Sequence, residues 1–254
     1  MKTKGLTLVE LLVVIVVIAL LIPILMRGCL EPPRVNGQLI CGTNLFGLGN
    51  AMLVYSNDYD DQWPRAGPAN ATWATQTVTS SLYLLVRGDY ISPRQFICRV
   101  DAGAVVFKAA DYSILWDFAD PIHNCSYAYH YPYTQFGIHG KSDPRMAVAA
   151  DRNPWYDPSA DQNRWFDFDP ASKDPKKQKA GNTEAHQIKG QNVLFADGHV
   201  DFEKRSYCGV DDDNIYTIGG TAPAHRKGAK PIGKNVKPAN NTDSLLVNEG
   251  QSPP

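Results

Sequence analysis

The stretch that organises this chain is LTLVELLVVIVVIALLIPILM, residues 6–26. It carries a single charge, at Glu10, and about 20 apolar residues are enough to cross a bilayer core as a helix. The sequence therefore predicts a transmembrane helix over residues 6–26. Lys2 and Lys4 precede it with no acidic residue between them and Glu10. This charge bias predicts a cytoplasmic amino terminus and an exported remainder of the chain.

The order of leader and apolar run differs from that of an ordinary secretory signal, whose small-residue cleavage site follows the apolar core. Here no Ala-x-Ala pattern follows, and the small residue, Gly5, comes first. This order resembles the class III signal of type IV pilins and type II secretion pseudopilins. In that family a prepilin peptidase cuts after the glycine and methylates the new amino terminus. The resemblance implies cleavage between Gly5 and Leu6, although Leu6 replaces the usual Phe or Met.

Glu10 is unusual, because a carboxylate inside a membrane costs at least a few kcal/mol unless it is paired. After the implied cleavage, Glu10 becomes the fifth residue of the chain, where the pilin family carries its acid. The freed amino terminus of a neighbouring subunit could then lie beside it, and an opposite charge within about 4–6 Å favours the ionised acid. The resemblance thus implies an assembly role for Glu10. The alternative is a plain signal anchor that tolerates a glutamate.

A second helix is expected after a break at Gly28 and Pro32-Pro33, because these residues interrupt a continuous helix. Apolar positions then recur at spacings of four and three residues, which predicts one stripe of an amphipathic helix. The stripe comprises Cys41, Leu45, Leu48, Met52, Tyr55 and Tyr59. The helix should end before Trp63-Pro64, since the residue before proline disfavours the helical region. Pilins carry such a helix packed against a sheet, normally without a proline break.

The clearest strand signal is NVLFADGHVDFE, residues 192–203. Asp-Gly between alternating apolar runs is a strong hairpin signal. With Asp197-Gly198 as a two-residue loop, Phe195 faces Val200 and Val193 faces Phe202. This register predicts four apolar residues on one face of a hairpin.

Other segments give weaker signals. A short helix is predicted over residues 81–91, a short strand and turn over 96–101, and a buried strand over 146–150 that ends at Asp151. The tyrosines at 127, 129, 131 and 133 alternate strictly, which predicts a strand with one aromatic face. That face could bind sugar rings, although core packing is the favoured interpretation. Residues 153–182 are expected to form a surface loop, and residues 221–254 an extended or disordered tail.

The carboxyl-terminal motif also resembles a family. Prepilin-like proteins that occur as large paralogous sets in some bacteria carry a histidine, a spacer of about nine residues, and then Asp-Gly-His-Val. The matching residues here are His186, Asp197, Gly198 and His199, with a spacer of ten. Those proteins also carry a Cys-x-x-Asn-Leu helix and a Phe-x-Cys-Pro-x-Asp turn, which correspond to residues 41–45 and 96–101, the latter without its proline. The resemblance implies a topology more than a chemistry.

Two groups of residues near the carboxyl end have side chains that can bind metal ions. Two imidazoles and a carboxylate, from His186, His199 and Asp197, would suit zinc, but turn geometry explains Asp197 better. Type II pseudopilins bind calcium in a carboxyl-terminal loop, and the run from Asp211 through Asp213 to Asn214 could offer oxygens to calcium. The run lacks EF-hand spacing, so a solvated acidic loop is favoured. The prediction is therefore no metal and no cofactor, with calcium as the open alternative.

The exported domain holds four cysteines, Cys41, Cys98, Cys125 and Cys208, and disulfides persist on that side of the membrane. Four cysteines allow three pairings. We favour Cys41–Cys98, because it would tie the helix to the sheet, which leaves Cys125 with Cys208. Cys29 lies beside the membrane and could stay free or pair between subunits.

The sequence thus predicts an α+β, pilin-like chain: a leader over 1–5, a transmembrane helix over 6–26, an exported domain over 27–220 with an amphipathic helix on an antiparallel sheet, and a tail over 221–254. No enzyme motif is present, and 25 basic against 26 acidic residues do not indicate nucleic-acid binding. The expected function is a structural subunit of a bacterial inner membrane, processed by prepilin peptidase, whose partners are other pilin-like subunits or a secretion machinery. Its domain would be periplasmic or extracellular. The alternatives are a membrane-tethered polysaccharide-binding module and, less favoured, an anchored hydrolase using His186, Asp197 and His199.

Overall fold

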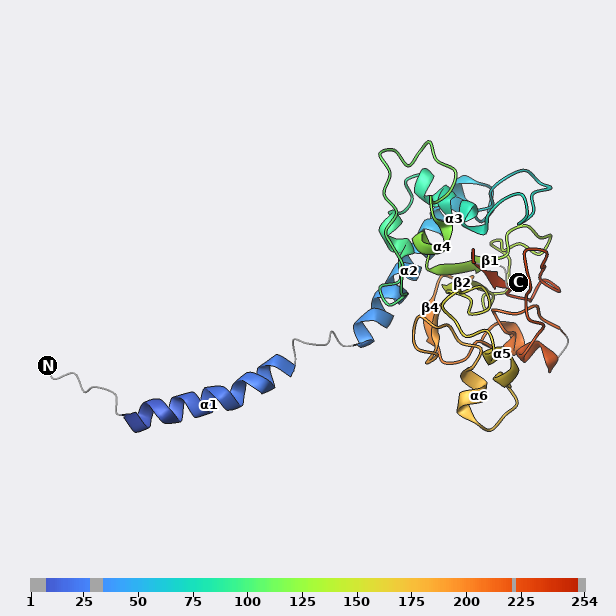
Figure 1. Cartoon of the computed structure of the whole chain (residues 1–254). Coiled ribbons are helices and arrows are strands. Elements are labelled where there is room, and N and C mark those ends of the chain that lie inside the picture. Colours follow the sequence, from blue (N-terminus) through green and yellow to red (C-terminus); the bar gives the residue numbers. More distant parts are fainter. Residues whose placement is uncertain (1–7, 28–33, 221–222, 251–254) are drawn as a thin grey trace. The chain divides into compact units, whose positions relative to one another are not determined.

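A computed structural model describes residues 8–27, 34–220 and 223–250 of the chain (Figure 1). The chain divides into two compact units, Met1–Gly37 and Gln38–Pro254. The predictions for Gly5 and Leu6, for Cys29, and for the helix break at Gly28 and Pro32-Pro33 lie outside the described residues.

The first unit contains α1, Leu8–Arg27, with Glu10 in its first turn. The side chains of Leu8–Ile18 are exposed. This stretch of α1 is apolar but shorter than the length needed to cross a membrane. One helix of the described residues is long and apolar enough to cross a membrane, namely Gly37–Asp58. That helix is part of α2, and 39% of its most apolar window is buried inside the domain. Because its apolar stripe packs in the core, we interpret it as the core helix of the second unit.

The second unit combines helices with a five-stranded antiparallel sheet of order β4-β3-β2-β1-β5. The strands are β1, Tyr127–His130; β2, Ala147–Asp151; β3, Gln191–Phe195; β4, Val200–Glu203; and β5, Leu246–Val247. The helices are α2, Arg34–Asp58; α3, Val78–Arg87; α4, Pro121–Asn124; α5, Arg164–Asp167; and α6, Pro175–Lys179, with 3-10 turns at Pro93–Phe96, Val210–Asp212 and Ala224–Arg226. Mixed helix and antiparallel sheet confirm the predicted α+β class.

The predicted stripe of α2 forms the centre of the core. Cys41, Leu45, Leu48 and Met52 are fully buried and Tyr55 nearly so. Tyr59 was wrongly included, because α2 ends at Asp58 and the Tyr59 side chain is 51% exposed. A side chain at Gly49 would begin 2.7 Å from a Leu194 methyl carbon, so this glycine lets the helix approach β3 closely.

The sheet is buried on both faces. Tyr127, Tyr129 and Leu194 point into the core that contains α2 and α3, whereas Ala128, Val193 and Phe195 point into a second apolar cluster. That second cluster is closed by long connections, whose buried anchors are Trp155, Phe168, Tyr207, Ile215 and Tyr216. The prediction of a surface loop over 153–182 was therefore wrong in part: the segment contains the short helices α5 and α6, and its buried Trp155 and Phe168 pack in the cluster on one face of the sheet.

The hairpin is present, but its predicted register was wrong by one residue. Leu194 pairs with Val200, and Val193 pairs with Asp201. Of the two turn residues Asp197 and Gly198, only Gly198 has positive φ, at 88°. A single left-handed glycine suits a three-residue loop with a bulge rather than a two-residue loop. Shifting the pairing by one residue turns the opposing side chains to other faces, so the four apolar residues do not share one face.

Of the two states predicted for the tail, the described residues 223–250 adopt the extended one, and part of the segment packs in the domain. Leu245, Leu246 and Val247 are fully buried, and β5 adds to the sheet beside β1. These three adjacent apolar residues dock a segment whose overall composition is polar. The short helix predicted over 81–91 is present as α3, earlier by a few residues. The predicted strand within 96–101 is absent, since a 3-10 turn ends at Phe96 and a turn follows.

Candidate functional site

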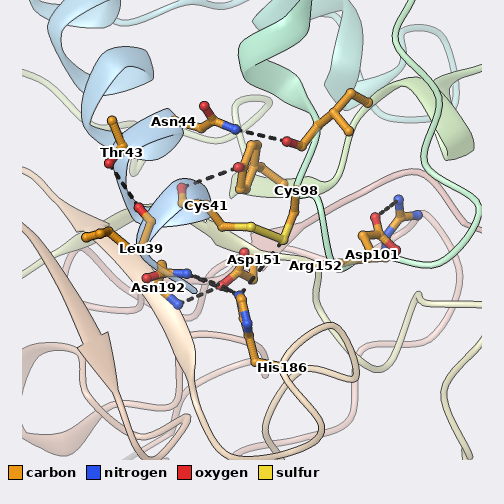
Figure 2. The surroundings of a disulfide bond; sticks show 12 residues. Leu39, Cys41, Thr43, Asn44, Cys98, Asp101, Asp151, Arg152, His186 and Asn192 are labelled. Atoms are coloured by element: carbon orange, nitrogen blue, oxygen red, sulfur yellow. Dashed lines mark hydrogen bonds and ion pairs between the residues drawn. A yellow bond between two sulfur atoms is a disulfide. The ribbon is translucent and has the colours of Figure 1, made fainter. Parts of the chain in front are cut away.

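A buried polar cluster lies where β2 ends, at Asp151 (Figure 2). One oxygen of the Asp151 carboxylate, Oδ2, accepts hydrogen bonds from the backbone N–H of Asn192 at 2.7 Å and from its side-chain amide at 3.0 Å. The same oxygen lies 3.0 Å from Nε2 of His186. Tyr216 donates its hydroxyl hydrogen to the Asp151 carbonyl at 2.7 Å. The cluster therefore ties β2, β3 and two connections together.

The disulfide between Cys41 and Cys98 borders this cluster and confirms the favoured pairing. It joins α2 to the turn that follows the 3-10 helix, across a sequence separation of 57 residues. Nε2 of His186 lies 3.9 Å from the sulfur of Cys98. His186 thus lies next to both the disulfide and the Asp151 carboxylate (Figure 2).

The two upstream motifs meet at the same place. The side-chain amide of Asn44 donates to the carbonyl of Ile97 at 2.9 Å, so the Cys-x-x-Asn helix holds the Cys98 turn by a second contact. At the far end of that turn, Asp101 pairs with Arg152 at 2.9 Å. Arg152 directly follows Asp151, and it also donates to the carbonyls of Ile122 and Cys125. The Asp151 cluster, the Cys41–Cys98 disulfide and the Arg152–Asp101 pair thus form one buried junction, to which each of these motif residues contributes.

The hairpin turn is a separate feature. Asp197 accepts a hydrogen bond from the backbone N–H of His199 at 3.1 Å and also pairs with its ring. The His199 ring stacks on Phe195 with centroids 4.4 Å apart, and the side chain is 46% exposed. Within the described ranges, the cluster of potential metal ligands that contains His186 includes neither Asp197 nor His199. The structure therefore does not bring together the three residues of the disfavoured zinc alternative.

The remaining cysteines and tyrosines differ from the predictions. Cys125 and Cys208 are free, so the second predicted disulfide was wrong. Burial raises the pKa of the Cys125 thiol to about 12 and holds that of Cys208 well above its ordinary value, which keeps both thiols protonated and unreactive. The alternating tyrosines are buried in the core at all four positions, as the favoured interpretation expected. They present no aromatic face to a sugar.

The acidic run divides into exposed and buried members. Asp211 and Asp212 are exposed and pair with Arg145 and Arg226. Asp213 is buried and lies near Asp243: the Oδ1 atoms of the two carboxylates lie 2.9 and 3.3 Å from the point where a side chain on Gly219 would begin. No ion pair links Asp213 or Asp243 to a basic side chain in the part of the chain that the structure describes. Calcium binding by this run stays an untested alternative to the favoured acidic loop, of which Asp213 is buried rather than solvated.

The buried acid pair should make stability depend on pH. Burial, reinforced by the Asp243 carboxylate, raises the pKa of Asp213 to about 8, and burial raises the pKa of Asp243 to about 6. Because both values exceed the ordinary 3.8, the folded chain holds protons that the unfolded chain releases. This stabilisation is fully present below about pH 4 and is lost as the pH rises through the two raised values.

We therefore expect the urea midpoint of the full chain in detergent to fall between about pH 5 and about pH 9. Asp213→Asn keeps an acceptor for the Ser244 N–H, which bonds to Asp213 at 2.9 Å, and should flatten this slope. The exposed neighbour Asp211 offers the control Asp211→Asn, which should leave the slope unchanged. An equal slope in Asp213→Asn and wild type would contradict the assignment.

The central residues of the buried junction, Asp151, Asn192 and Arg152, were not among the predicted site residues. One signal pointed to the first of them, since Asp151 is an acid that directly ends an apolar strand. Nothing in the sequence identified Asn192, because its partners come from segments far away along the chain. No family model, curated protein or solved structure matches this chain.

The chemistry of the junction is that of a cross-link. His186, Asp151 and both disulfide cysteines are buried, so no substrate surface is formed by them. The disulfide, the His–Asp contact and the Arg152–Asp101 pair together fasten α2 and its turn to the edge of the sheet. This arrangement holds the helix and the sheet of the domain in one fixed geometry.

Proposed function

We propose that this chain is a membrane-anchored, pilin-like structural subunit, exported by a prepilin-type signal and able to join a filament or secretion pseudopilus. The observation that carries the proposal is the order of its parts. A basic leader ending in Gly5 precedes an apolar helix with Glu10 in its first turn, and a second helix then packs on an antiparallel sheet. The α1 side chains described, those of residues 8–18 and of Leu21, are exposed and, apart from Glu10, apolar, as suits a segment that lies in lipid.

The character of the buried junction supports this proposal over an enzymatic one. His186 is enclosed by Asp151, Asn192 and the disulfide, which gives it a structural role. The polysaccharide-binding alternative rested on an aromatic face, and its four tyrosines are buried. A rigid, cross-linked domain on a membrane helix is what a subunit exposed outside the cytoplasm requires.

The processing step predicts a definite mass. Chain isolated from native membranes should begin at Leu6, with the mass of residues 1–5 lost and one methyl group gained, as measured by intact mass spectrometry and amino-terminal sequencing. Gly5→Val should keep the leader on most of the protein, because the resemblance places the cut after this glycine. Thr3→Val changes a neighbouring leader residue to the same side chain and serves as the control. A wild-type chain that still begins at Met1 would refute the processing proposal.

Assembly is tested separately. Glu10→Ala removes the carboxylate from α1 and should leave membrane insertion intact, since it makes the segment more apolar. We expect it to abolish cross-linking of the chain to other pilin-like subunits in membranes. If Glu10→Ala cross-links as wild type does, then Glu10 has no role in assembly. If the wild-type chain itself gives no cross-links, then the chain is an anchored protein and not an assembling subunit.

A further inference from the structure

The buried junction has a second possible chemical state, because a disulfide is a reducible bond. Cys41, Cys98, Asp151 and His186 each offer one ligand atom, and these four atoms all lie within 4.8 Å of one another. Thiolates, imidazole and carboxylate are the groups that hold Zn²⁺ in four-coordinate sites. We propose that, once the Cys41–Cys98 bond is reduced, these four side chains bind one Zn²⁺ ion.

The distances already approach those of a zinc site. Tetrahedral bonds of about 2.0–2.3 Å place neighbouring ligand atoms about 3.3–3.8 Å apart. Nε2 of His186 lies 3.9 Å from the Cys98 sulfur and 3.0 Å from Oδ2 of Asp151, which belongs to the same carboxylate as Oδ1, the oxygen that would bind the ion. The main movement required is that the two sulfur atoms separate from bonding distance, which reduction itself permits.

A buried oxygen without a hydrogen-bond partner supports a cation at this place. Oδ1 of Asp151 is buried and has no hydrogen-bond partner among the described residues. Its other oxygen is held by the backbone and side chain of Asn192. A buried acceptor without a partner is costly, and a cation would satisfy it. Asn192 would then orient the carboxylate, as outer-shell partners of metal ligands do.

The ligand set favours zinc over other common ions. Magnesium and calcium take oxygen ligands, whereas two sulfurs, one nitrogen and one oxygen in a tetrahedral arrangement suit Zn²⁺. All four side chains are buried, so water would not compete for the fourth position. The site therefore has the closed coordination of structural zinc rather than the open one of catalytic zinc.

The chemical step balances as follows. A dithiol gives two electrons and two protons to the Cys41–Cys98 bond and closes to its own disulfide, which leaves two thiols on the chain. Zn²⁺ then displaces both thiol protons to solvent and binds the two thiolates. The ion would connect four segments of the chain, namely α2, the Cys98 turn, the end of β2 and the connection before β3. The junction would thus stay fastened in both redox states.

The test uses the full chain in detergent, reduced by a phosphine that is oxidised to its oxide with the oxygen of one water molecule. Titration with Co²⁺ should give the sulfur-to-metal charge-transfer absorption and the intense visible bands of a tetrahedral thiolate site, at one ion per chain. Zn²⁺ should displace the cobalt. The oxidised chain should show neither the charge-transfer absorption nor the visible bands. X-ray absorption of the zinc form should find two sulfur and two nitrogen or oxygen ligands.

Variants separate this site from incidental binding. His186→Ala should weaken Zn²⁺ binding by more than the roughly 10–100-fold that loss of an outer-shell partner costs. His199→Ala removes the exposed hairpin histidine and Cys208→Ser removes a free thiol, and both should bind as wild type does. Wild-type affinity in His186→Ala would overturn the proposal. So would a reduced wild-type chain that keeps its near-ultraviolet circular dichroism but shows no charge-transfer band, or one that unfolds and is not refolded by Zn²⁺.

Discussion

Replacing Cys41 and Cys98 together with alanine should lower the free energy of unfolding by about 4 kcal/mol, measured by urea denaturation of the full chain in detergent without reductant. The disulfide closes a loop of 57 residues in sequence separation, and the loss of unfolded-state entropy for a loop of that length accounts for about this amount. The fluorescence of Trp73 and Trp155, both buried, reports the transition. A loss of this size is a large fraction of the stability of a typical domain.

The controls for this prediction come from the same chain. Cys208→Ala changes a free, partly buried cysteine and should shift stability much less, because no cross-link is lost. Cys41→Ala alone should cost nearly as much as the double variant, since the covalent bond can be broken only once. A double variant whose urea midpoint equals that of wild type would show that the junction is held by its polar contacts rather than by the disulfide.

Local patterns in the sequence predicted local structure well. The spacing of Cys41, Leu45, Leu48 and Met52 identified the buried face of α2, because helical periodicity depends only on neighbours along the chain. The Cys41–Cys98 pairing was also correct, since one cysteine lies on that buried face. The packing of the tail into the domain was missed for a related reason. Composition averaged over residues 221–254 concealed three adjacent apolar residues, 245–247, that are buried together.

The hairpin shows where pattern fails. Asp197-Gly198 located the turn, but both two-residue and three-residue loops accept this pair. The choice depends on whether Asp197 takes positive φ, and it does not. A shift of one residue in the pairing of β3 with β4 then decides which side chains face α2 and which face Trp155. The sequence of β3 cannot supply this, because its last three residues, 193–195, are all apolar and are buried on alternating faces.

The candidate site was predicted only in pieces. His186, Cys41 and Cys98 were singled out, and the structure brings them together. The carboxylate that joins them, Asp151, and its orienting amide, Asn192, come from two neighbouring strands. Their contact follows from the pairing of β2 with β3, which is a tertiary fact. The Asp197–His199 pair resembled a ligand set in sequence yet lies in an exposed turn.

Asp101→Ala should destabilise the domain by about 3–5 kcal/mol, because it leaves the guanidinium of Arg152 buried without its counter-ion. The two side chains are only 6% and 4% exposed and are joined at 2.9 Å. Arg152 would keep its bonds to the carbonyls of Ile122 and Cys125, but these do not neutralise its charge. Thermal or urea unfolding of the full chain in detergent measures the loss.

A matched ion pair on the surface tests whether burial causes the large loss of stability in Asp101→Ala. Asp143 and Arg145 lie 3.1 Å apart with the arginine 60% exposed, so Asp143→Ala should cost no more than about 1 kcal/mol. Replacing both buried partners, as Asp101→Ala with Arg152→Met, should recover part of the loss, since an apolar side chain needs no counter-ion. If the double variant is less stable than Asp101→Ala alone, then the bonds of Arg152 to the carbonyls of Ile122 and Cys125 matter more than its charge. Arg152 would then hold the Cys98 turn mainly as a hydrogen-bond donor, and the motif aspartate would serve to orient it.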